Sequence, residues 1–240
     1  MRYRATHLPM AEQPPGKPQH VAEFGKGGTP PVEADGRLNA PAFHINHTPI
    51  WSVLSRFLLG RSGDVLEIGS GTGQHVVQFA GQSPTITWWP SDHLDSHLRS
   101  IDAWRRHERR DNVQAPVRLD ASASDWKLAE QGLPSAFTAM FCANVIHIAP
   151  WHVAEGIFAG AGRHLSPDGR LFLYGPFRRD GAHNSLGNET FDANLRRDNP
   201  EWGVRDTADL RRLAEANGLR LAELIEMPSN NATLSFERIR

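Results

Sequence analysis

The fold of this chain is decided by the stretch Asp64-Val65-Leu66-Glu67-Ile68-Gly69-Ser70-Gly71-Thr72-Gly73-Gln74. Its apolar positions, Val65, Leu66 and Ile68, are typical of a strand that is covered on both faces. Three glycines at alternate positions allow a sharp backbone turn and leave no side chains above it. The stretch therefore predicts a buried strand, a turn on which a flat ligand can lie, and a helix beyond it.

The chain has 240 residues, a formal net charge of −1 and a single cysteine, Cys142. This length fits one large α/β domain, with or without a tail. The near-zero charge gives no general attraction to nucleic acids or anionic membranes, and no apolar run is long enough to span a bilayer. One cysteine excludes an internal disulfide framework and suits a reducing compartment. We therefore predict a cytoplasmic protein and expect neither a nucleic-acid partner nor a membrane partner.

The first 40 residues have the composition of a flexible tail. Proline and glycine at Pro14-Pro15-Gly16 and Pro30-Pro31 interrupt any periodic pattern, and apolar residues are sparse. We therefore predict a flexible N-terminal tail over residues 1–40 and a folded domain over residues 41–240. The alternative is an arm that folds over the active site when substrate binds.

Strand-like and helix-like segments alternate along residues 41–240. Thr48 followed by Pro49 predicts the start of one helix, and Thr207 predicts the cap of another. The polar, weakly periodic residues 177–204 predict a long loop. We expect a Rossmann-like α/β fold, in which a doubly wound, mostly parallel seven-stranded sheet carries helices on both faces. Its strands are expected over residues 65–68, 86–92, 113–119, 137–148, 171–174, 219–227 and 233–239.

Two carboxylates follow strands that neighbour the glycine turn. Ligands of doubly wound sheets bind beyond the carboxyl ends of the strands, so these side chains should share one rim. Asp92 ends the second strand and can accept hydrogen bonds from both hydroxyls of a ribose. Asp120 ends the third strand and can accept from an adenine amino group. We therefore expect a ligand that contains a nucleoside.

Glu67 separates two classes of nucleoside cofactor. A dinucleotide enzyme places a pyrophosphate on its Gly-x-Gly-x-x-Gly turn, where this carboxylate would repel it. The same carboxylate suits the cationic amino acid end of S-adenosylmethionine, and the glycines here follow a Gly-x-Gly-x-Gly spacing. We predict S-adenosyl-L-methionine as the cofactor, with the cofactor-binding residues Glu67, Gly69, Ser70, Gly71, Gly73, Asp92, Asp120, Ala121 and Asn144.

The segment from Val65 to His75 resembles motif I of the class I S-adenosylmethionine-dependent methyltransferases. More narrowly, the chain is similar to methyltransferase-like protein 26 and its bacterial relatives, and this resemblance implies both the fold and the cofactor. That family usually has an Arg-Asn pair before the Pro-Ile of its first helix; here Asn46 matches and the arginine is absent. The resemblance supplies no substrate. Its further matches are Trp89-Pro90-Ser91-Asp92, Leu119-Asp120, Ala143-Asn144, Tyr174-Gly175-Pro176, Asn199-Pro200-Glu201-Trp202-Gly203 with Arg205-Asp206, and Met227-Pro228-Ser229-Asn230-Asn231.

His147, just beyond the fourth strand, is the candidate catalytic residue. Methyl transfer is an in-line displacement that needs alignment and sometimes a base, and an imidazole can remove a proton near neutral pH. The alternative is a histidine that packs against the next helix or caps it. His44 and His47 have no third ligand of matching spacing, so no metal site is predicted. The candidate substrate-binding residues are Asn46, Tyr174, Trp151 and Arg178.

Each of those substrate-binding assignments has a structural alternative. Tyr174 and Trp151 suit a pocket wall and suit aromatic core filling equally well. Arg178 suits an anionic substrate group and also suits a solvated loop surface. Asn144 suits either the amino group of the cofactor or the backbone at the end of a strand.

These features together predict a methyltransferase that acts on an oxygen, nitrogen or sulfur atom of a small molecule. Two other functions fit parts of the pattern. One is a non-catalytic regulatory module that binds the cofactor on the same fold. The other is a nicotinamide-dependent oxidoreductase, which Glu67 disfavours. The sequence leaves the oligomeric state open, with a homodimer among the options.

Overall fold

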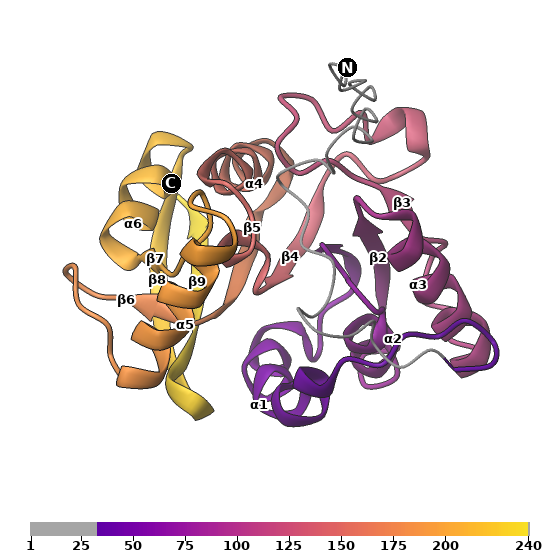
Figure 1. The fold of residues 1–240 in the computed structure, drawn as a ribbon. Coiled ribbons are helices and arrows are strands. Elements are labelled where there is room, and N and C mark those ends of the chain that lie inside the picture. The colour runs from indigo at the N-terminus through magenta and orange to yellow at the C-terminus, as the bar shows by residue number, and fades with distance from the viewer. Residues whose placement is uncertain (1–32, 240) are drawn as a thin grey trace, which may run out of the picture.

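A seven-stranded sheet forms the centre of the computed structural model, which describes residues 33–239 (Figure 1). The strands follow the order β3-β2-β1-β4-β5-β9-β8. Strands β1 to β5 pair in parallel, whereas β9 runs antiparallel to both of its neighbours. The predicted fold class is confirmed. The strands are β1 (Gly63–Ile68), β2 (Ile86–Asp92), β3 (Val117–Arg118), β4 (Phe137–Ala143), β5 (Leu165–Gly175), β8 (Leu219–Met227) and β9 (Asn231–Arg238).

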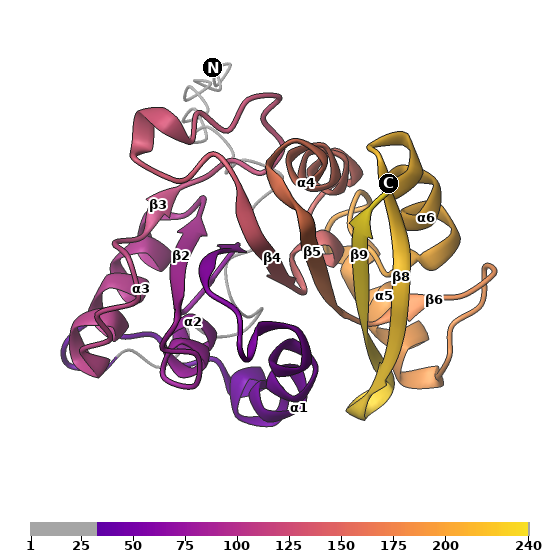
Figure 2. The same cartoon turned by 180° about the vertical axis from the view of Figure 1, so that it is seen from behind.

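Helices cover both faces of this sheet, as the two opposite views in Figures 1 and 2 show. One face is covered by α1 (Pro41–Leu58), α2 (Gln74–Ala80) and α3 (Asp95–Glu108). The other is covered by α4 (Trp151–His164) and α6 (Thr207–Ala216). Two hydrophobic clusters result, because successive side chains of a strand point to opposite faces: Val65 joins the first and Leu66 the second.

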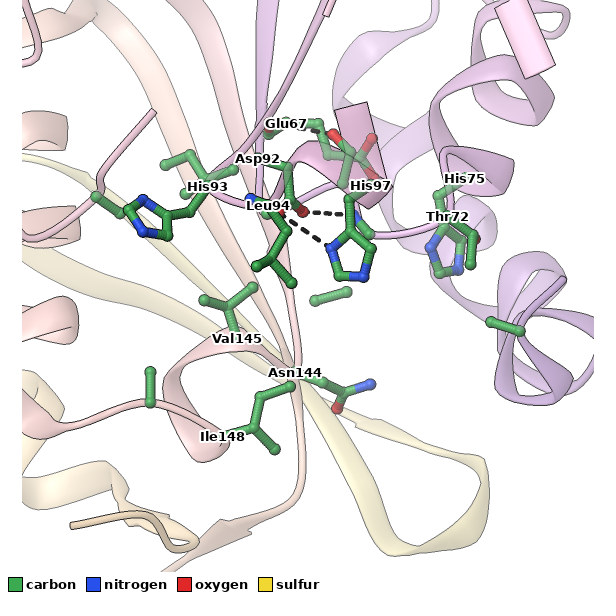
Figure 3. A pocket seen from close by; sticks show the side chains of 18 of the residues that line it. Glu67, Thr72, His75, Asp92, His93, Leu94, His97, Asn144, Val145 and Ile148 are labelled. Carbon is green, nitrogen blue, oxygen red and sulfur yellow. Dashed lines mark hydrogen bonds and ion pairs between the residues drawn. The ribbon is translucent and has the colours of Figure 1, made fainter. Parts of the chain in front are cut away.

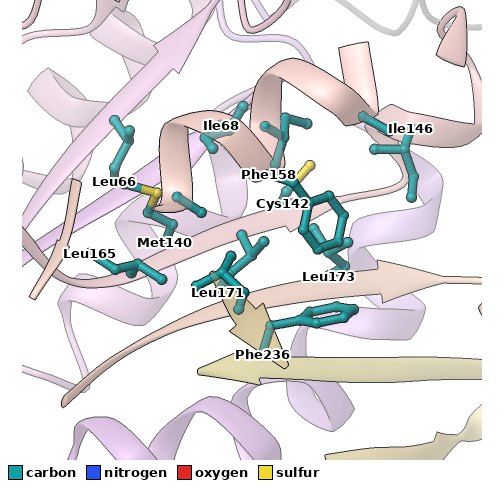
Figure 4. Close-up of a cluster of buried hydrophobic side chains, with 14 of the residues drawn as sticks. Leu66, Ile68, Met140, Cys142, Ile146, Phe158, Leu165, Leu171, Leu173 and Phe236 are labelled. Atoms are coloured by element: carbon teal, nitrogen blue, oxygen red, sulfur yellow. The ribbon is translucent and has the colours of Figure 1, made fainter. Parts of the chain in front are cut away.

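The cluster beneath α4 is the larger part of the core (Figure 4). Phe158 of α4 packs edge to face against Phe236 of β9, with ring centroids 4.9 Å apart. Both rings are fully buried, and burial of one such side chain stabilises the fold by about 2–3 kcal/mol. The lone cysteine, Cys142, lies buried in this cluster on β4. These contacts pack α4 against the neighbouring strands β4, β5 and β9.

The first helix begins earlier than the sequence predicts. Helix α1 starts with Pro41 in its first turn, and Pro49 lies inside it. A proline inside a helix removes one backbone hydrogen bond, so Thr48-Pro49 alone favours a start at that point. Here the buried side chains of Ile50 and Leu54 pack the second half of the helix on the sheet and offset that loss.

Residues 177–204 are not the predicted loop. They contain β6 (Phe177–Arg178) and a helix of 13 residues, α5 (Leu186–Asp198). Ser185 caps α5 by accepting a hydrogen bond from the Asn188 amide at 3.1 Å. β6 pairs with β7 (Arg205–Asp206) in a separate two-stranded sheet.

Smaller differences concern where elements end. β4 stops at Ala143, and the predicted continuation to residue 148 is instead η2 (Val145–His147). The described structure also has η1 (Ala129–Gln131) and η3 (Pro228–Asn230). The cap of α6 is Asp206, which accepts from the Ala208 amide, rather than Thr207. A carboxylate is as good an N-cap acceptor as a hydroxyl, and its spacing to the helix decides between them.

Strands β8 and β9 form a hairpin that is connected by three residues, Pro228, Ser229 and Asn230. Ser229 and Asn230 have positive φ of 61° and 57°. Asparagine adopts this left-handed conformation more readily than most residues other than glycine. The Asn230 carbonyl accepts side-chain amides from Asn184 at 3.0 Å and Asn188 at 2.8 Å. The start of α5 is therefore attached to the tip of the hairpin.

The described part of the predicted tail, residues 33–40, is packed on the domain at its end. Leu38 and Ala40 are buried, and the Ala40 amide donates to Gln74 Oε1 at 2.7 Å. The Leu38 carbonyl accepts from the indole of Trp104 on α3. Residues 1–32 lie outside the described residues. Over residues 33–239, no helix is both long enough and apolar enough to cross a membrane.

Candidate functional site

A cavity lies at the carboxyl ends of β1, β2 and β4, and α1 closes one side of it (Figure 3). It brings together most of the side chains that the sequence places on this rim. Asp92 comes from the end of β2, and Asn144 follows β4. The lining residues that were predicted for the site are Asn46, Glu67, Gly69, Ser70, Gly71, Asp92, Asp120, Ala121 and Asn144.

Hydrogen bonds connect the glycine turn and the end of β1 to the neighbouring strand β2. The Ser70 amide donates to the Ser91 carbonyl at 2.8 Å, and the Ser91 hydroxyl donates to the Glu67 carbonyl at 2.7 Å. These bonds connect the end of β1 to the end of β2, so the two sides of the cavity keep a fixed separation.

Two glycines of the turn have no room for a side chain. Gly69 has φ of 67°, and a Cβ there would lie 2.5 Å from Cγ2 of Val145. Gly73 has φ of 89°, and a Cβ there would lie 2.7 Å from the backbone Cα of Ile101 on α3. Glycine alone adopts this left-handed backbone without strain. Gly73 therefore packs α2 against α3 and does not line the cavity.

Asp92 accepts three hydrogen bonds within the protein. Its Oδ2 accepts from the Gly71 amide at 2.9 Å, and its Oδ1 accepts from the Leu94 amide at 3.0 Å. Nδ1 of His97 on α3 lies 3.0 Å from the same Oδ1 (Figure 3). The carboxylate is buried, and these donors fix its orientation at the cavity wall.

Glu67 is a buried carboxyl with incomplete hydrogen bonding. The residue is only 2% exposed, and its Oε2 has no hydrogen-bond partner among the described residues. Burial raises the pKa of Glu67 to about 8, with a hydrogen bond from Ser70 opposing the shift and the charge of Asp92 adding a smaller contribution to it. Because Glu67 lines the cavity, a cation placed there would supply the missing partner and favour the ionised carboxylate.

Asp120 and Asn144 continue the rim on either side of these residues. Oδ1 of Asp120 accepts from the amide and the hydroxyl of Ser122, at 2.9 and 2.6 Å. Asn144 has φ of 61°, a strained conformation for a residue other than glycine. The backbone amide of Asn144 donates to the backbone carbonyl of Tyr174 at 2.8 Å, which fixes the chain where it leaves β4. Strain of this kind is common at functional sites.

The sequence analysis missed several lining residues. Thr72 and His75 lie within and directly after the glycine motif, and His93 and His97 follow the end of β2. Their proximity in sequence to Gly73 and Asp92 was the available signal. Two further lining residues come from α1, Ala42 and Phe43, and no motif marks them; for Phe43 the distance of three residues to Asn46, one helical turn, is the available signal.

His147 does not reach the cavity. The residue is completely buried, and its ring packs edge-on against Phe177, with centroids 5.2 Å apart. Burial, with a smaller contribution from the charge of Arg205, lowers the pKa of His147 to about 3. This shift favours the neutral imidazole. The structure does not place His147 at the cavity wall, because η2 directs its side chain behind the rim, and its role as a general base stays a prediction.

Three of the four candidate substrate-binding residues also lie away from the cavity. Tyr174 is buried, and its hydroxyl accepts from Nδ2 of Asn231 at 2.9 Å. Trp151 lies beside Arg205, whose guanidinium carbon is 5.7 Å from the ring centroid. Arg178 belongs to β6, and its Nε is buried. Of the four candidates, the structure brings Asn46 alone to the cavity wall.

Residues 37–238 match the model of one protein family, described as protein of unknown function, DUF938. The chain belongs to the DUF938 family. The description of the family names no activity. Across residues 33–239, no three side chains of His, Cys, Asp or Glu come together in a group that could hold a metal ion.

Solved structures of methyltransferases share the fold of this DUF938 protein. CalO1, a methyltransferase in calicheamicin biosynthesis solved with S-adenosylhomocysteine bound, has 17% identity and a TM-score of 0.59. The mitomycin 7-O-methyltransferase MmcR has 14% identity and a TM-score of 0.65. An O-methyltransferase family protein from Burkholderia thailandensis has 14% identity and a TM-score of 0.68.

The matches to these structures include most of this chain but only part of theirs. They cover 82%, 81% and 82% of this chain, and 57%, 54% and 57% of CalO1, MmcR and the Burkholderia protein, respectively. This chain therefore corresponds to little more than half the length of each neighbour. At these identities the likeness establishes the fold.

Proposed function

We propose that this DUF938 protein is an S-adenosylmethionine-dependent methyltransferase that acts on an oxygen, nitrogen or sulfur nucleophile of a small molecule. The observation that carries the proposal is Glu67. Its buried Oε2 lacks a partner at the wall of the cavity, beside the glycine turn and Asp92. An ammonium group of an amino acid supplies that partner and favours the ionised carboxylate, whereas a pyrophosphate would bring negative charge beside the carboxylate of Asp92.

The other lining residues have the chemistry that the rest of this cofactor needs. Asp92 has a fixed carboxylate for ribose hydroxyls, and Asp120 has one for the adenine amino group. Gly69 and Gly71 leave the backbone uncovered at the turn. When bound, S-adenosylmethionine supplies an electrophilic methyl group. The residues of this chain bind and orient it, and they exclude water from the wall formed by Val145 and Ile148.

The comparisons support this proposal at the level of the fold, since the neighbours named above are methyltransferases. The sequence resemblance to methyltransferase-like protein 26 and its bacterial relatives points the same way. Two alternatives are kept as outcomes of the experiment. A regulatory module would bind the cofactor without turnover, and a nicotinamide-dependent oxidoreductase would bind a dinucleotide.

Calorimetry with S-adenosylhomocysteine, S-adenosylmethionine and NAD tests the proposal. We expect binding of the first two ligands and no binding of NAD. Asp92→Ala should weaken binding at least about 100-fold, because it removes the ribose acceptor and leaves the Gly71 amide without a partner. Asp95→Ala is the matched control, since Asp95 is exposed at the start of α3.

Thermal melting of both variants establishes that they fold. Absence of S-adenosylhomocysteine binding by the wild-type protein would refute the cofactor assignment, and undiminished binding by Asp92→Ala would refute the site. Binding without methyl incorporation into any member of a broad acceptor panel would favour the regulatory module. Methylation of an acceptor establishes the enzyme class.

A further inference from the structure

The α1 end of the cavity differs chemically from the end formed by β1, β2 and β3. The acids Glu67, Asp92 and Asp120 line the strand ends, and no lysine or arginine is among the described lining residues. The α1 end is formed by Phe43 and Asn46, with His75 from α2. A carboxylate or phosphate on a substrate would find no counter-charge in this cavity, so its desolvation would be uncompensated.

Asn46 and His75 form a hydrogen-bonded pair in this wall. Oδ1 of Asn46 lies 2.8 Å from Nε2 of His75, and Asn46 is only 7% exposed. Burial lowers the pKa of His75 to about 3, with a smaller contribution from His47, so the ring is neutral. Since an amide oxygen only accepts, Nε2 carries the ring proton and donates it to Asn46. His75 is too weakly basic to act as a general base.

This arrangement leaves one polar group of the pair unused. Within residues 33–239, Nδ2 of Asn46 donates no hydrogen bond, whereas Oδ1 is occupied by His75. Asn46 lines the cavity, so its amide N–H is the donor that α1 offers to a ligand. A ligand atom at this position must accept a hydrogen bond, as a hydroxyl or phenolate oxygen does and the nitrogen of an aromatic amine, whose lone pair is delocalised into the ring, does only weakly.

Aromatic rings hold the pair and extend the wall. The ring of Phe43 packs edge-on against His75, with centroids 5.2 Å apart. His75 in turn stacks on Phe79, with centroids 5.4 Å apart, and lies 6.2 Å from Phe141. These contacts restrict rotation of His75 and present the ring of Phe43 to the cavity. Such a wall suits a flat, apolar body more than a flexible or charged one.

Resting on the proposed function, we propose that the α1 end is the methyl-acceptor subsite and takes an uncharged, planar compound with an acidic hydroxyl, such as a phenol. Asn46 donates Nδ2–H to the reacting oxygen, and His75 is a positioning residue that keeps this donor turned to the cavity. The acceptor oxygen forms the new C–O bond with its electron pair. The C–S bond of the methyl donor breaks with its pair moving to sulfur, and the hydroxyl proton passes to water.

The order of residues along the rim supports this location. Asp120 follows β3, Asp92 ends β2, the glycine turn follows β1, and Asn144 follows β4. A nucleoside held at Asp92 and Asp120 with its amino acid end at Glu67 therefore leaves the α1 side of the cavity for the acceptor.

The first experiment measures acceptor binding to the protein saturated with S-adenosylhomocysteine. Three flat compounds of similar size serve as probes: 2-naphthol, 6-hydroxy-2-naphthoate and 2-naphthylamine. We expect calorimetric binding of 2-naphthol, at least about tenfold weaker binding of the carboxylate, and methylation of 2-naphthol in preference to the amine. Equal or tighter binding of the carboxylate, faster methylation of the amine, or binding of none of the three would overturn the proposal.

The second experiment changes the donor. In Asn46→Asp an acceptor replaces the Nδ2–H donor at nearly the same volume, so KM for 2-naphthol should rise at least about tenfold. The dissociation constant of S-adenosylhomocysteine should change less than about threefold. Thr48→Asp is the matched control, because it adds the same charge on the exposed side of α1. An unchanged KM in Asn46→Asp contradicts the donor role.

The positioning role of His75 is tested by a pair of substitutions. Gln at this position can donate to Asn46 Oδ1 through its amide, whereas Leu cannot. We expect His75→Leu to raise KM for 2-naphthol about tenfold. In His75→Gln the KM should stay close to the wild-type value. Equal KM values in the two variants would refute the positioning role. Loss of S-adenosylhomocysteine binding by the wild-type protein would refute the proposed function, whereas binding without these acceptor effects would refute this subsite alone.

Discussion

The end of β1 and the connection between β4 and α4 each contain a buried ionisable residue with at least one unpaired polar atom. At the end of β1 it is Glu67, whose Oε2 has no partner in the described chain. In the connection it is His147, both of whose ring nitrogens lack one there. Burial moves their pKa values in opposite directions, to about 8 and about 3, so both groups are neutral at pH 7.

The difference between the two regions is access. Glu67 lines the cavity, whereas His147 lies behind the rim against Phe177. An unpaired buried atom therefore indicates a ligand only where a cavity reaches it. At His147, which this cavity does not reach, the unpaired ring nitrogens reduce the stability of the folded protein. Measurements on the two residues can separate these roles.

The largest effect is expected on stability as a function of pH. The folded state holds the Glu67 proton up to a pKa of about 8, above the ordinary 4.5, so this contribution to stability is present below pH 4.5 and lost as pH rises to 8. For His147 the pKa falls from 6.5 to about 3, so its contribution is present above pH 6.5 and lost as pH falls towards 3. Each effect is worth roughly 3–5 kcal/mol.

Urea unfolding of the ligand-free protein at a series of pH values measures how the free energy of unfolding changes with pH in both ranges. Glu67→Gln should remove the loss on the alkaline side, and His147→Leu should remove the loss on the acid side. Glu215→Gln, at an exposed position of α6, should leave the profile unchanged. If Glu67→Gln lost stability between pH 4.5 and 8 as the wild-type protein does, the Glu67 carboxyl would be ionised in the free protein.

The next effect concerns ligand affinity. Glu67→Gln removes the charge that would pair with an ammonium, so the dissociation constant of S-adenosylhomocysteine should rise about 100-fold. His147→Leu should change it less than about threefold, because His147 does not line the cavity. Calorimetry at pH 8 measures both values. Comparable weakening by the two substitutions would contradict the distinction drawn between the regions.

The smallest effect compares Gly175, which ends β5 and packs against His147, with Gly69 of the glycine turn. A Cβ on Gly175 would lie 2.4 Å from Nε2 of His147, so Gly175→Ala should destabilise the protein by about 1–3 kcal/mol. Truncating His147 to Ala makes room for that Cβ, so a double-mutant cycle should show coupling of about 1 kcal/mol or more.

Gly69→Ala provides the contrast to that cycle. Its Cβ would meet Cγ2 of Val145 at 2.5 Å, and its φ of 67° is unfavourable for alanine. Truncating Val145 to Ala should therefore rescue Gly69→Ala only in part, since the backbone strain remains. Complete rescue, measured by urea unfolding, would show that the clash alone requires glycine.

Sequence reasoning succeeds where local backbone chemistry determines position. The strand Gly63–Ile68, its glycine turn and the strand-terminal Asp92 follow from apolar patterning and from the conformational range of glycine. It fails at α5, because that helix is held by polar contacts: Asp192 accepts from the Val204 amide at 2.7 Å, and Asn188 donates to the hairpin. Periodicity of apolar residues cannot detect such support.

The same limit explains why the sequence does not predict the direction of the His147 side chain. Its position after β4 correctly places its backbone near the rim, but the direction of a side chain depends on the turn that follows the strand. Asn144 adopts a left-handed conformation and η2 follows it, which directs His147 towards Phe177. The cavity wall at Phe43 and His75 depends likewise on how α1 packs beside α2, which no local pattern encodes.

The hairpin of β8 and β9 also has a consequence for the order of folding. Within the described chain β8 pairs with β9 alone, whereas β9 also pairs with β5. A β-hairpin with so short a connection can form within about 1–10 microseconds, without waiting for distant segments. The insertion of β9 beside β5 joins residues more than fifty positions apart in the chain and carries a larger loop-closure entropy. We therefore expect the C-terminal hairpin to form first as a local unit and to pair with the rest of the sheet afterwards.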